Sequence, residues 1–178
     1  MGERRARTGR LRVDDDIRTC TAAAWDVGLR DDGDGHVDER LFMAGDRIAR
    51  IDLDRNRSET ADQRFHYGAN GLLEKIESDD DFDGHFERID TLRKSQMVES
   101  RIDSDRDGRR DARAEYMLGV IYREEWFDKN GNVVKRVQYE DGVPKTGEFD
   151  SDGDGRLDTA RRYDRTGEII ESKPLPMK

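Results

Sequence analysis

A repeat of about 24 residues is the feature that most constrains the fold of this chain. Glycines stand in equivalent acidic contexts at Gly84, Gly108, Gly131 and Gly155, with spacings of 24, 23 and 24 residues. Gly35 opens the series, and in the second unit Arg57 takes the place of the glycine. A leucine or tyrosine follows eight residues after each of the four regular glycines, and Phe42 and Tyr67 fill this role in the first two units: Leu92, Tyr116, Tyr139 and Tyr163. Because several markers share one period, we expect an array of repeated supersecondary units.

Each unit reads as an acidic loop, a strand, a tight glycine-containing turn and a second strand. Val133, Val137 and Tyr139 alternate with polar residues before an Asp-Gly turn at 141–142, which is typical of a β-hairpin. The sequence predicts six such hairpins between about residues 30 and 172. Residues 17–30 are expected to form a truncated seventh unit, in which Trp25 and Gly28 take the aromatic and turn positions. The predicted fold is an all-β, elongated antiparallel meander of about six β-hairpin repeats, with the acidic loops along one edge; a closed propeller is a weaker alternative.

Composition agrees with a thin array. Charged residues make up 42% of the 178 residues and hydrophobic residues only 33%, with a mean hydropathy of -1.08. Such a chain cannot fill a thick two-layer core, so either disorder or an array whose units cover only their neighbours is expected. Cross-strand charge pairs should then supplement modest apolar contacts. We expect a flexible, arginine-rich arm over residues 1–16, a single hairpin array over 17–172 and a tail over 173–178.

The acidic loops have the residue types that calcium prefers. Calcium takes six to eight hard oxygen ligands, and a loop with carboxylates at positions 1, 3 and 5 and a glycine at position 6 can wrap one ion. Three loops also carry a carboxylate at position 9 and are complete: "DDDFDGHFE", "DSDRDGRRD" and "DSDGDGRLD". The predicted ligands are Asp79, Asp81, Asp83 and Glu87; Asp103, Asp105, Asp107 and Asp111; and Asp150, Asp152, Asp154 and Asp158. A fourth loop is nearly complete, with Asp32, Asp34 and Asp38 as ligands and Arg30 at position 1, where Asp31 is the substitute.

Two further loops depart from the pattern. "DLDRNRSET", counted from Asp52, lacks the glycine and the ninth-position acid, and the segment at 128–134 keeps only Asp128, Asn130 and Gly131. Both are interpreted as plain turns, since Asp, Asn and Gly are favoured turn residues in any case. For the other four loops, calcium is the stronger interpretation because the matches recur in register. Four Ca²⁺ ions would supply eight positive charges against a formal net charge of -9.

These loops are not EF-hands. An EF-hand needs flanking helices and a carboxylate at position 12, where two of the complete loops have Ala114 and Arg161. The motif instead resembles the aspartate-rich calcium repeats of thrombospondin type 3, and the segments between the loops are similar to the hairpins of YD and MORN-type repeats. This resemblance implies an exported, calcium-stabilised bacterial repeat protein of the cell envelope. The sequence has no signal-peptide h-region, so a cytoplasmic location is the alternative.

The remaining functional classes have weaker support. The net negative charge disfavours nucleic acid as the main partner, and no apolar run is long enough for a transmembrane segment. One cysteine and the dispersed histidines His36, His66 and His85 give neither zinc-ligand spacing nor a catalytic set. The expected function is therefore a non-enzymatic, calcium-binding structural or adhesive protein. The alternative is a module that binds a protein or glycan ligand on its exposed sheet face.

Overall fold

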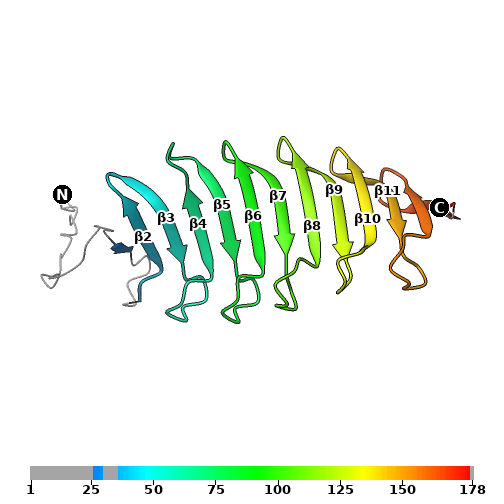
Figure 1. Ribbon diagram of the computed structural model, residues 1–178. Coiled ribbons are helices and arrows are strands. Elements are labelled where there is room, and N and C mark those ends of the chain that lie inside the picture. Colours follow the sequence, from blue (N-terminus) through cyan, green and yellow to red (C-terminus); the bar gives the residue numbers. More distant parts are fainter. Residues whose placement is uncertain (1–25, 30–35, 177–178) are drawn as a thin grey trace, which may run out of the picture.

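The computed structural model describes residues 26–29 and 36–176, so the expected arm over residues 1–16 lies outside the described residues. The described chain forms one antiparallel sheet of thirteen strands in which each strand pairs with its neighbours in sequence (Figure 1). The predicted all-β meander is confirmed. The strands are β1 (Asp26–Leu29), β2 (Glu39–Ala44), β3 (Arg47–Leu53), β4 (Gln63–Tyr67), β5 (Leu73–Ser78), β6 (Arg88–Arg93), β7 (Gln96–Ile102), β8 (Ala112–Met117), β9 (Val120–Phe127), β10 (Val133–Glu140), β11 (Val143–Phe149), β12 (Thr159–Tyr163) and β13 (Ile169–Pro174).

The connections alternate between two rims of the sheet. Short turns join the strands within each hairpin at one rim, and the acidic loops join successive hairpins at the other (Figure 1). We call the second the acidic rim; its described loops are residues 54–62, 79–87, 103–111, 128–132 and 150–158. The topology therefore brings candidate ligands from across the chain to one side of the molecule.

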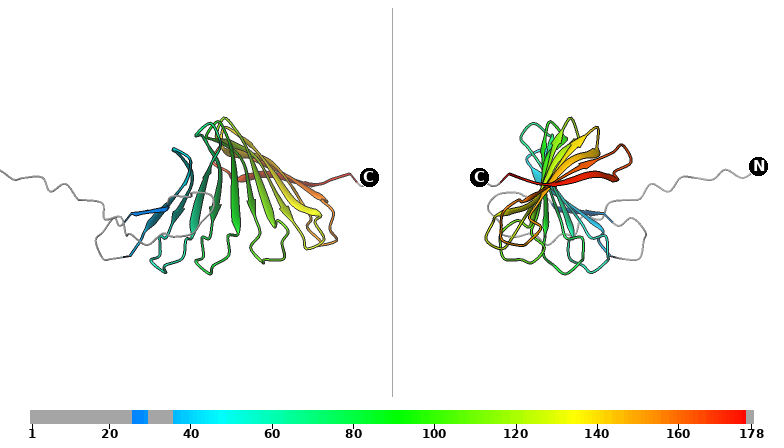
Figure 2. Two further views of the ribbon diagram at one scale, coloured as in Figure 1. Left: turned by 60° about the vertical axis from the view of Figure 1, so that its left-hand side comes forward. Right: turned by 90° about the vertical axis from the view of Figure 1, so that its right-hand side faces the viewer.

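Each of the six hairpins carries a register shift immediately before the last or the next-to-last residue of its first strand. The shifts fall immediately before Met43, Tyr67, Leu92, Tyr116, Tyr139 and Tyr163. The periodic aromatic or leucine thus marks a β-bulge, and in the first unit the equivalent residue is Met43 and not the expected Phe42. Bulges increase the local right-handed twist, and the sheet twists strongly along its length (Figure 2).

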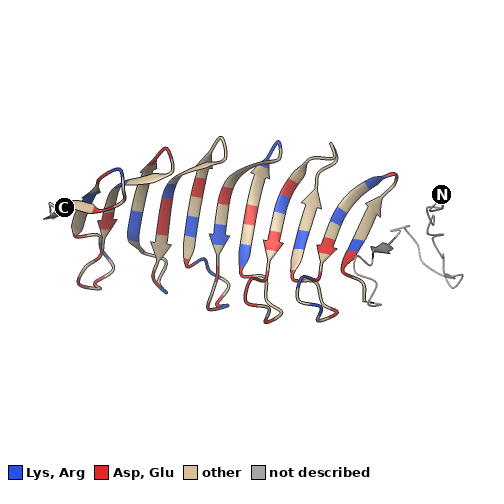
Figure 3. Ribbon diagram, turned by 180° about the vertical axis from the view of Figure 1, so that it is seen from behind, with Lys and Arg blue, Asp and Glu red and all other residues tan. Residues whose placement is uncertain are grey.

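Neither face of the sheet carries a conventional hydrophobic core. Val137 is the only buried hydrophobic residue in the described part of the chain, whereas eight polar or charged residues are buried. Basic and acidic residues alternate across adjacent strands (Figure 3). The carboxylate of Glu125 on β9, only 5% exposed, accepts hydrogen bonds from Arg113 of β8 at 3.1 Å, from Arg136 of β10 at 2.9 Å, and from Arg123. The predicted cross-strand charge pairs are therefore a principal contact within the sheet.

Aromatic side chains on the opposite face are covered by cations. The ammonium of Lys135 lies 3.8 Å from the ring centroid of Trp126, and the guanidinium of Arg161 lies 4.3 Å from that of Phe149. Long basic side chains shield apolar surface in this way while keeping their charge in water. A chain with few hydrophobic residues can thereby protect part of the apolar surface of a single-layer sheet.

Some expected boundaries differ from the structure. Gly28, expected at a turn, lies inside β1 opposite Arg40, so the truncated seventh unit contributes a strand. At the other end β13 continues through Lys173 and Pro174, which pair with Ala160 and Thr159 and were expected in the tail. The described residues contain no helix that is long and apolar enough to cross a membrane.

Candidate metal centres

The first aspartate of each complete loop fixes the loop conformation. Asp79 accepts hydrogen bonds from the backbone N–H groups of Asp83 at 3.1 Å and Gly84 at 2.8 Å. Asp150 does the same with Asp154 at 3.2 Å and Gly155 at 2.8 Å. The glycine at position 6 has a φ of 92° at Gly84 and 87° at Gly155, a left-handed conformation that favours glycine. The D-x-D-x-D-G pattern therefore has a local structural cause.

The ninth-position carboxylate closes each loop. The backbone N–H of position 2 donates to it, from Asp80 to Glu87 at 2.7 Å and from Ser104 to Asp111 at 2.6 Å. The Ser104 hydroxyl also donates to Asp111, at 2.5 Å. These bonds return the end of the loop to its beginning, so that position 9 lies beside positions 1 and 3.

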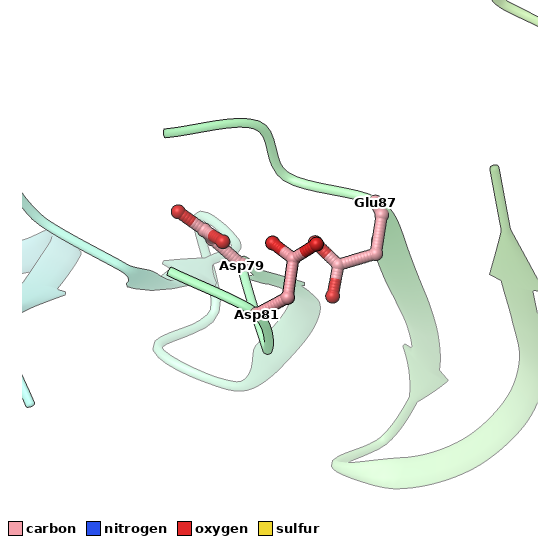
Figure 4. Close-up of side chains that lie close together, drawn as sticks. All are labelled: Asp79, Asp81 and Glu87. Carbon is pink, nitrogen blue, oxygen red and sulfur yellow. The ribbon is translucent and has the colours of Figure 1, made fainter. Parts of the chain in front are cut away.

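Three groups of three carboxylates result. Each offers one ligand atom per residue, and these atoms lie within 4.8 Å of one another. The groups are Asp79, Asp81 and Glu87 (Figure 4); Asp103, Asp105 and Asp111; and Asp150, Asp152 and Asp158. All nine residues are predicted ligands, and each group contains positions 1, 3 and 9 of its loop.

Two observations test whether these groups suit a cation. Glu87 Oε2 and Asp103 Oδ1 are buried oxygen atoms without a hydrogen-bond partner, and both belong to residues of the groups. A buried carboxylate oxygen without a donor is costly, and a hard cation would satisfy it. Three carboxylates in close approach also repel one another, and a divalent ion would relieve that repulsion. The residues therefore fit a hard, oxygen-preferring ion such as calcium.

The carboxylates at position 5 lie outside the three groups. Asp83, Asp107 and Asp154 each accept a hydrogen bond from the backbone N–H two residues later, at 3.0, 2.7 and 2.9 Å. Asp83 also pairs with Arg106 of the next loop. The sequence pattern predicted these three aspartates as ligands together with the others; the structure does not bring them into the three groups, and each accepts a hydrogen bond within its turn.

Hydrogen bonds favour the ionised form of the ninth-position acids. The Ser104 hydroxyl and backbone amide lower the pKa of Asp111 from its ordinary value, and Ser151 and Thr159 lower the pKa of Asp158. Both groups are thus kept charged, which is the form that binds a cation.

The N-terminal loop is only partly described. Asp32 and Asp34 lie outside the described residues, and the backbone carbonyl of Asp38 accepts a hydrogen bond from the N–H of Asp54 at 2.9 Å. At 128–132 the loop is short, and Asp128 accepts backbone hydrogen bonds from Asn130 at 2.9 Å and Asn132 at 2.8 Å. Asp164 makes the same contacts in a turn at the opposite rim, so this geometry does not require a metal.

The second loop corrects the sequence interpretation. Its register begins at Asp54 and not at Asp52, and its ninth position is Asp62, an acid that the count from Asp52 missed. Asp54 accepts N–H bonds from Ser58 at 3.0 Å and Glu59 at 2.7 Å, as Asp79 does in its own loop. Asp52 instead belongs to β3, where it pairs with Arg50 at 2.7 Å. Asp52 and Asp54 form a D-x-D pair that favours a count from Asp52, and the sequence signal for the correct register was Asp62, eight residues after Asp54.

Comparisons with known proteins give no assignment. No protein-family model matches the chain, and no curated protein matches it. Solved structures with partial likeness include the GtfA/B complex, at 15% identity and a TM-score of 0.37, over 58% of this chain and 18% of that one. A mutant of S. aureus TarM in complex with fondaparinux, α-GlcNAc-glycerol and UDP follows at 10% identity and a TM-score of 0.34, over 69% and 21%. The chain spans about a fifth of the length of these structures, and likeness at this level carries no argument about function.

Proposed function

We propose that this chain is a calcium-binding, calcium-stabilised structural or adhesive repeat protein without catalytic activity. The observation that carries the proposal is the recurrence of one three-carboxylate group, at positions 1, 3 and 9, in loops 79–87, 103–111 and 150–158. Isolated acidic residues are common on protein surfaces, whereas three equivalent groups in one repeated loop indicate a repeated role.

The thin sheet explains why ion binding would matter to such a protein. Few apolar groups are buried, and the acidic rim gathers like charges that oppose folding. Each ion that binds only the folded chain would add about 2.7 kcal/mol at a free concentration of about 100 times its Kd. In the folded array calcium would therefore act as a clamp between successive hairpins.

Calcium titration by calorimetry, with thermal unfolding followed by circular dichroism, tests the proposal. Calcium should raise the Tm of the wild type, and EGTA should lower it. Asp105→Ala and Asp152→Ala should each remove one site and part of the calcium-dependent rise in Tm, because each deletes a carboxylate from one group.

Asn130→Ala is the matched control, because it changes a residue of the acidic rim outside the three groups. Its calcium stoichiometry should equal that of the wild type. The proposal fails if EGTA leaves both the circular dichroism spectrum and the Tm unchanged, or if all three variants lose calcium-dependent stability equally.

A further inference from the structure

Loop 54–62 has the conformation of the candidate metal loops but lacks their carboxylates at positions 3 and 5. Asp54 and Asp62 hold positions 1 and 9, with exposures of 9% and 2%, while positions 3 and 5 are the neutral Asn56 and Ser58. Position 6 is Glu59, which has a φ of 69° where the complete loops have glycine. Two buried carboxylates are therefore held in the metal-loop fold by a loop with fewer carboxylates at the ligand positions.

A guanidinium lies against the buried ninth-position carboxylate. Arg55 holds position 2; its backbone N–H donates to Asp62 Oδ2 at 2.7 Å, and its side-chain Nε donates to Oδ1 at 2.5 Å. Loops 103–111 and 150–158 have serines at position 2, Ser104 and Ser151, whose hydroxyls bond to the equivalent carboxylates at 2.5 and 2.6 Å. The arginine thus keeps the contact that serine makes and adds a permanent positive charge to it.

The same side chain reaches the next loop. Arg55 Nη2 donates to the backbone carbonyl of Asp79 at 2.9 Å and lies 3.6 Å from Asp80 Oδ1. Asp79 is the most buried member of the candidate group in loop 79–87, at 2% exposure. One guanidinium therefore joins the ninth-position acid of one loop to the first two residues of its neighbour.

We propose that Arg55 is a built-in cation that holds loop 54–62 in the metal-loop conformation without an ion and positions the start of loop 79–87 for ion binding. The part that concerns loop 79–87 rests on the proposed function. The two loops then differ in how they depend on calcium. Loop 54–62 stays ordered without calcium, whereas Arg55 positions loop 79–87 to bind an ion. Arg55 acts here as a positioning residue, since it contacts the backbone of the candidate ligand Asp79 and none of its carboxylate oxygens.

Hydrogen exchange of the full chain in EGTA tests this without depending on calcium. In Arg55→Ser, which introduces the residue found at this position in two other loops, the amides of Ser58, Glu59, Asp83 and Gly84 should exchange at least about tenfold faster than in the wild type. Arg55→Lys keeps a positive charge but not the planar guanidinium, so its exchange rates at these amides should lie between those of the wild type and of Arg55→Ser. Arg156→Ser removes an exposed arginine from loop 150–158 and should leave all four amides unchanged.

The internal reference is the exchange of strands β10 and β11, which should match the wild type and show that the array is folded. Unchanged rates in either loop of Arg55→Ser would overturn the proposal, as would equal acceleration in Arg156→Ser. If Arg55→Ser does not fold, Arg55→Lys provides the same comparison. A failure of calcium binding would appear separately, in the calorimetric titration of the wild type, and would leave the result on loop 54–62 intact.

Discussion

At the scale of single residues, positions 1 and 3 of an acidic loop have different roles. Asp79 is buried and accepts two backbone N–H bonds, whereas Asp81 is exposed and accepts one long bond, at 3.3 Å from the N–H of Asp83. Replacing Asp79 leaves two backbone donors without their acceptor, with or without an ion. Replacing Asp81 removes mainly a carboxylate from the candidate metal group.

Asp79→Ala should therefore lower the free energy of unfolding by about 1–3 kcal/mol even in EGTA. Asp81→Ala should change it by less than about 0.5 kcal/mol in EGTA, while lowering the stability measured in calcium. Urea unfolding of both variants in the two buffers separates the roles. Equal losses in EGTA would contradict this division of roles between positions 1 and 3.

At the scale of residues, the sequence predicted some features of the acidic loops but not others. The glycine period predicted the positions of the three complete loops because a left-handed residue is required at position 6 in each of them. It could not place loop 54–62, where Glu59 adopts that conformation and a strand aspartate, Asp52, extends the D-x-D alternation. Nor could it show which carboxylates come together, because Asp81 and Asp83 each accept a hydrogen bond from the N–H two residues later, yet only Asp81 lies in the group with Asp79 and Glu87.

At the scale of elements, Glu125 connects three consecutive strands. Burial raises the pKa of its carboxyl, but hydrogen bonds from Arg136 and Arg123 and the charges of Arg123 and Arg113 outweigh burial, so the pKa lies below its ordinary value of 4.5. The folded state therefore binds this proton less readily than the unfolded state does. The resulting stability is present above about pH 4.5 and is lost as the pH falls through the folded pKa.

Glu125→Gln should consequently lower the stability at pH 7 by about 2 kcal/mol, since three arginines lose their charged acceptor. It should also flatten the decline in stability below pH 4.5 relative to the wild type. Denaturant unfolding across pH 3 to 7 measures both effects. Glu140→Gln is the control. Glu140 forms an exposed ion pair with Lys145 beside the turn between β10 and β11, and this pair should contribute little to the free energy of unfolding. Equal pH profiles for wild type and Glu125→Gln would contradict this role.

At the scale of the whole molecule, the topology limits how far a local loss of stability extends along the sheet. Every strand pairs only with its sequence neighbours, and in the described chain no second layer covers the sheet. The stability of such an array is close to a sum of unit and nearest-neighbour terms. The period predicted this architecture from sequence, because each hairpin repeats the same local signals. The twist was not predicted in the same detail, since it depends on six bulges whose extra residues carry no common type.

Calcium removal should therefore loosen the array locally. Hydrogen exchange in EGTA, compared with calcium, should accelerate most in the strands beside the three candidate loops, β5 to β8 and β11 to β12. The strands joined by loop 128–132, β9 and β10, should change least, because Asn130 and Asn132 satisfy Asp128 without an ion and the Glu125 network persists. Strand β3 should also stay protected, since Arg55 supplies the charge at its loop. A uniform acceleration across all strands would mean that the array unfolds as one cooperative unit, and the nearest-neighbour account of its stability would then be wrong.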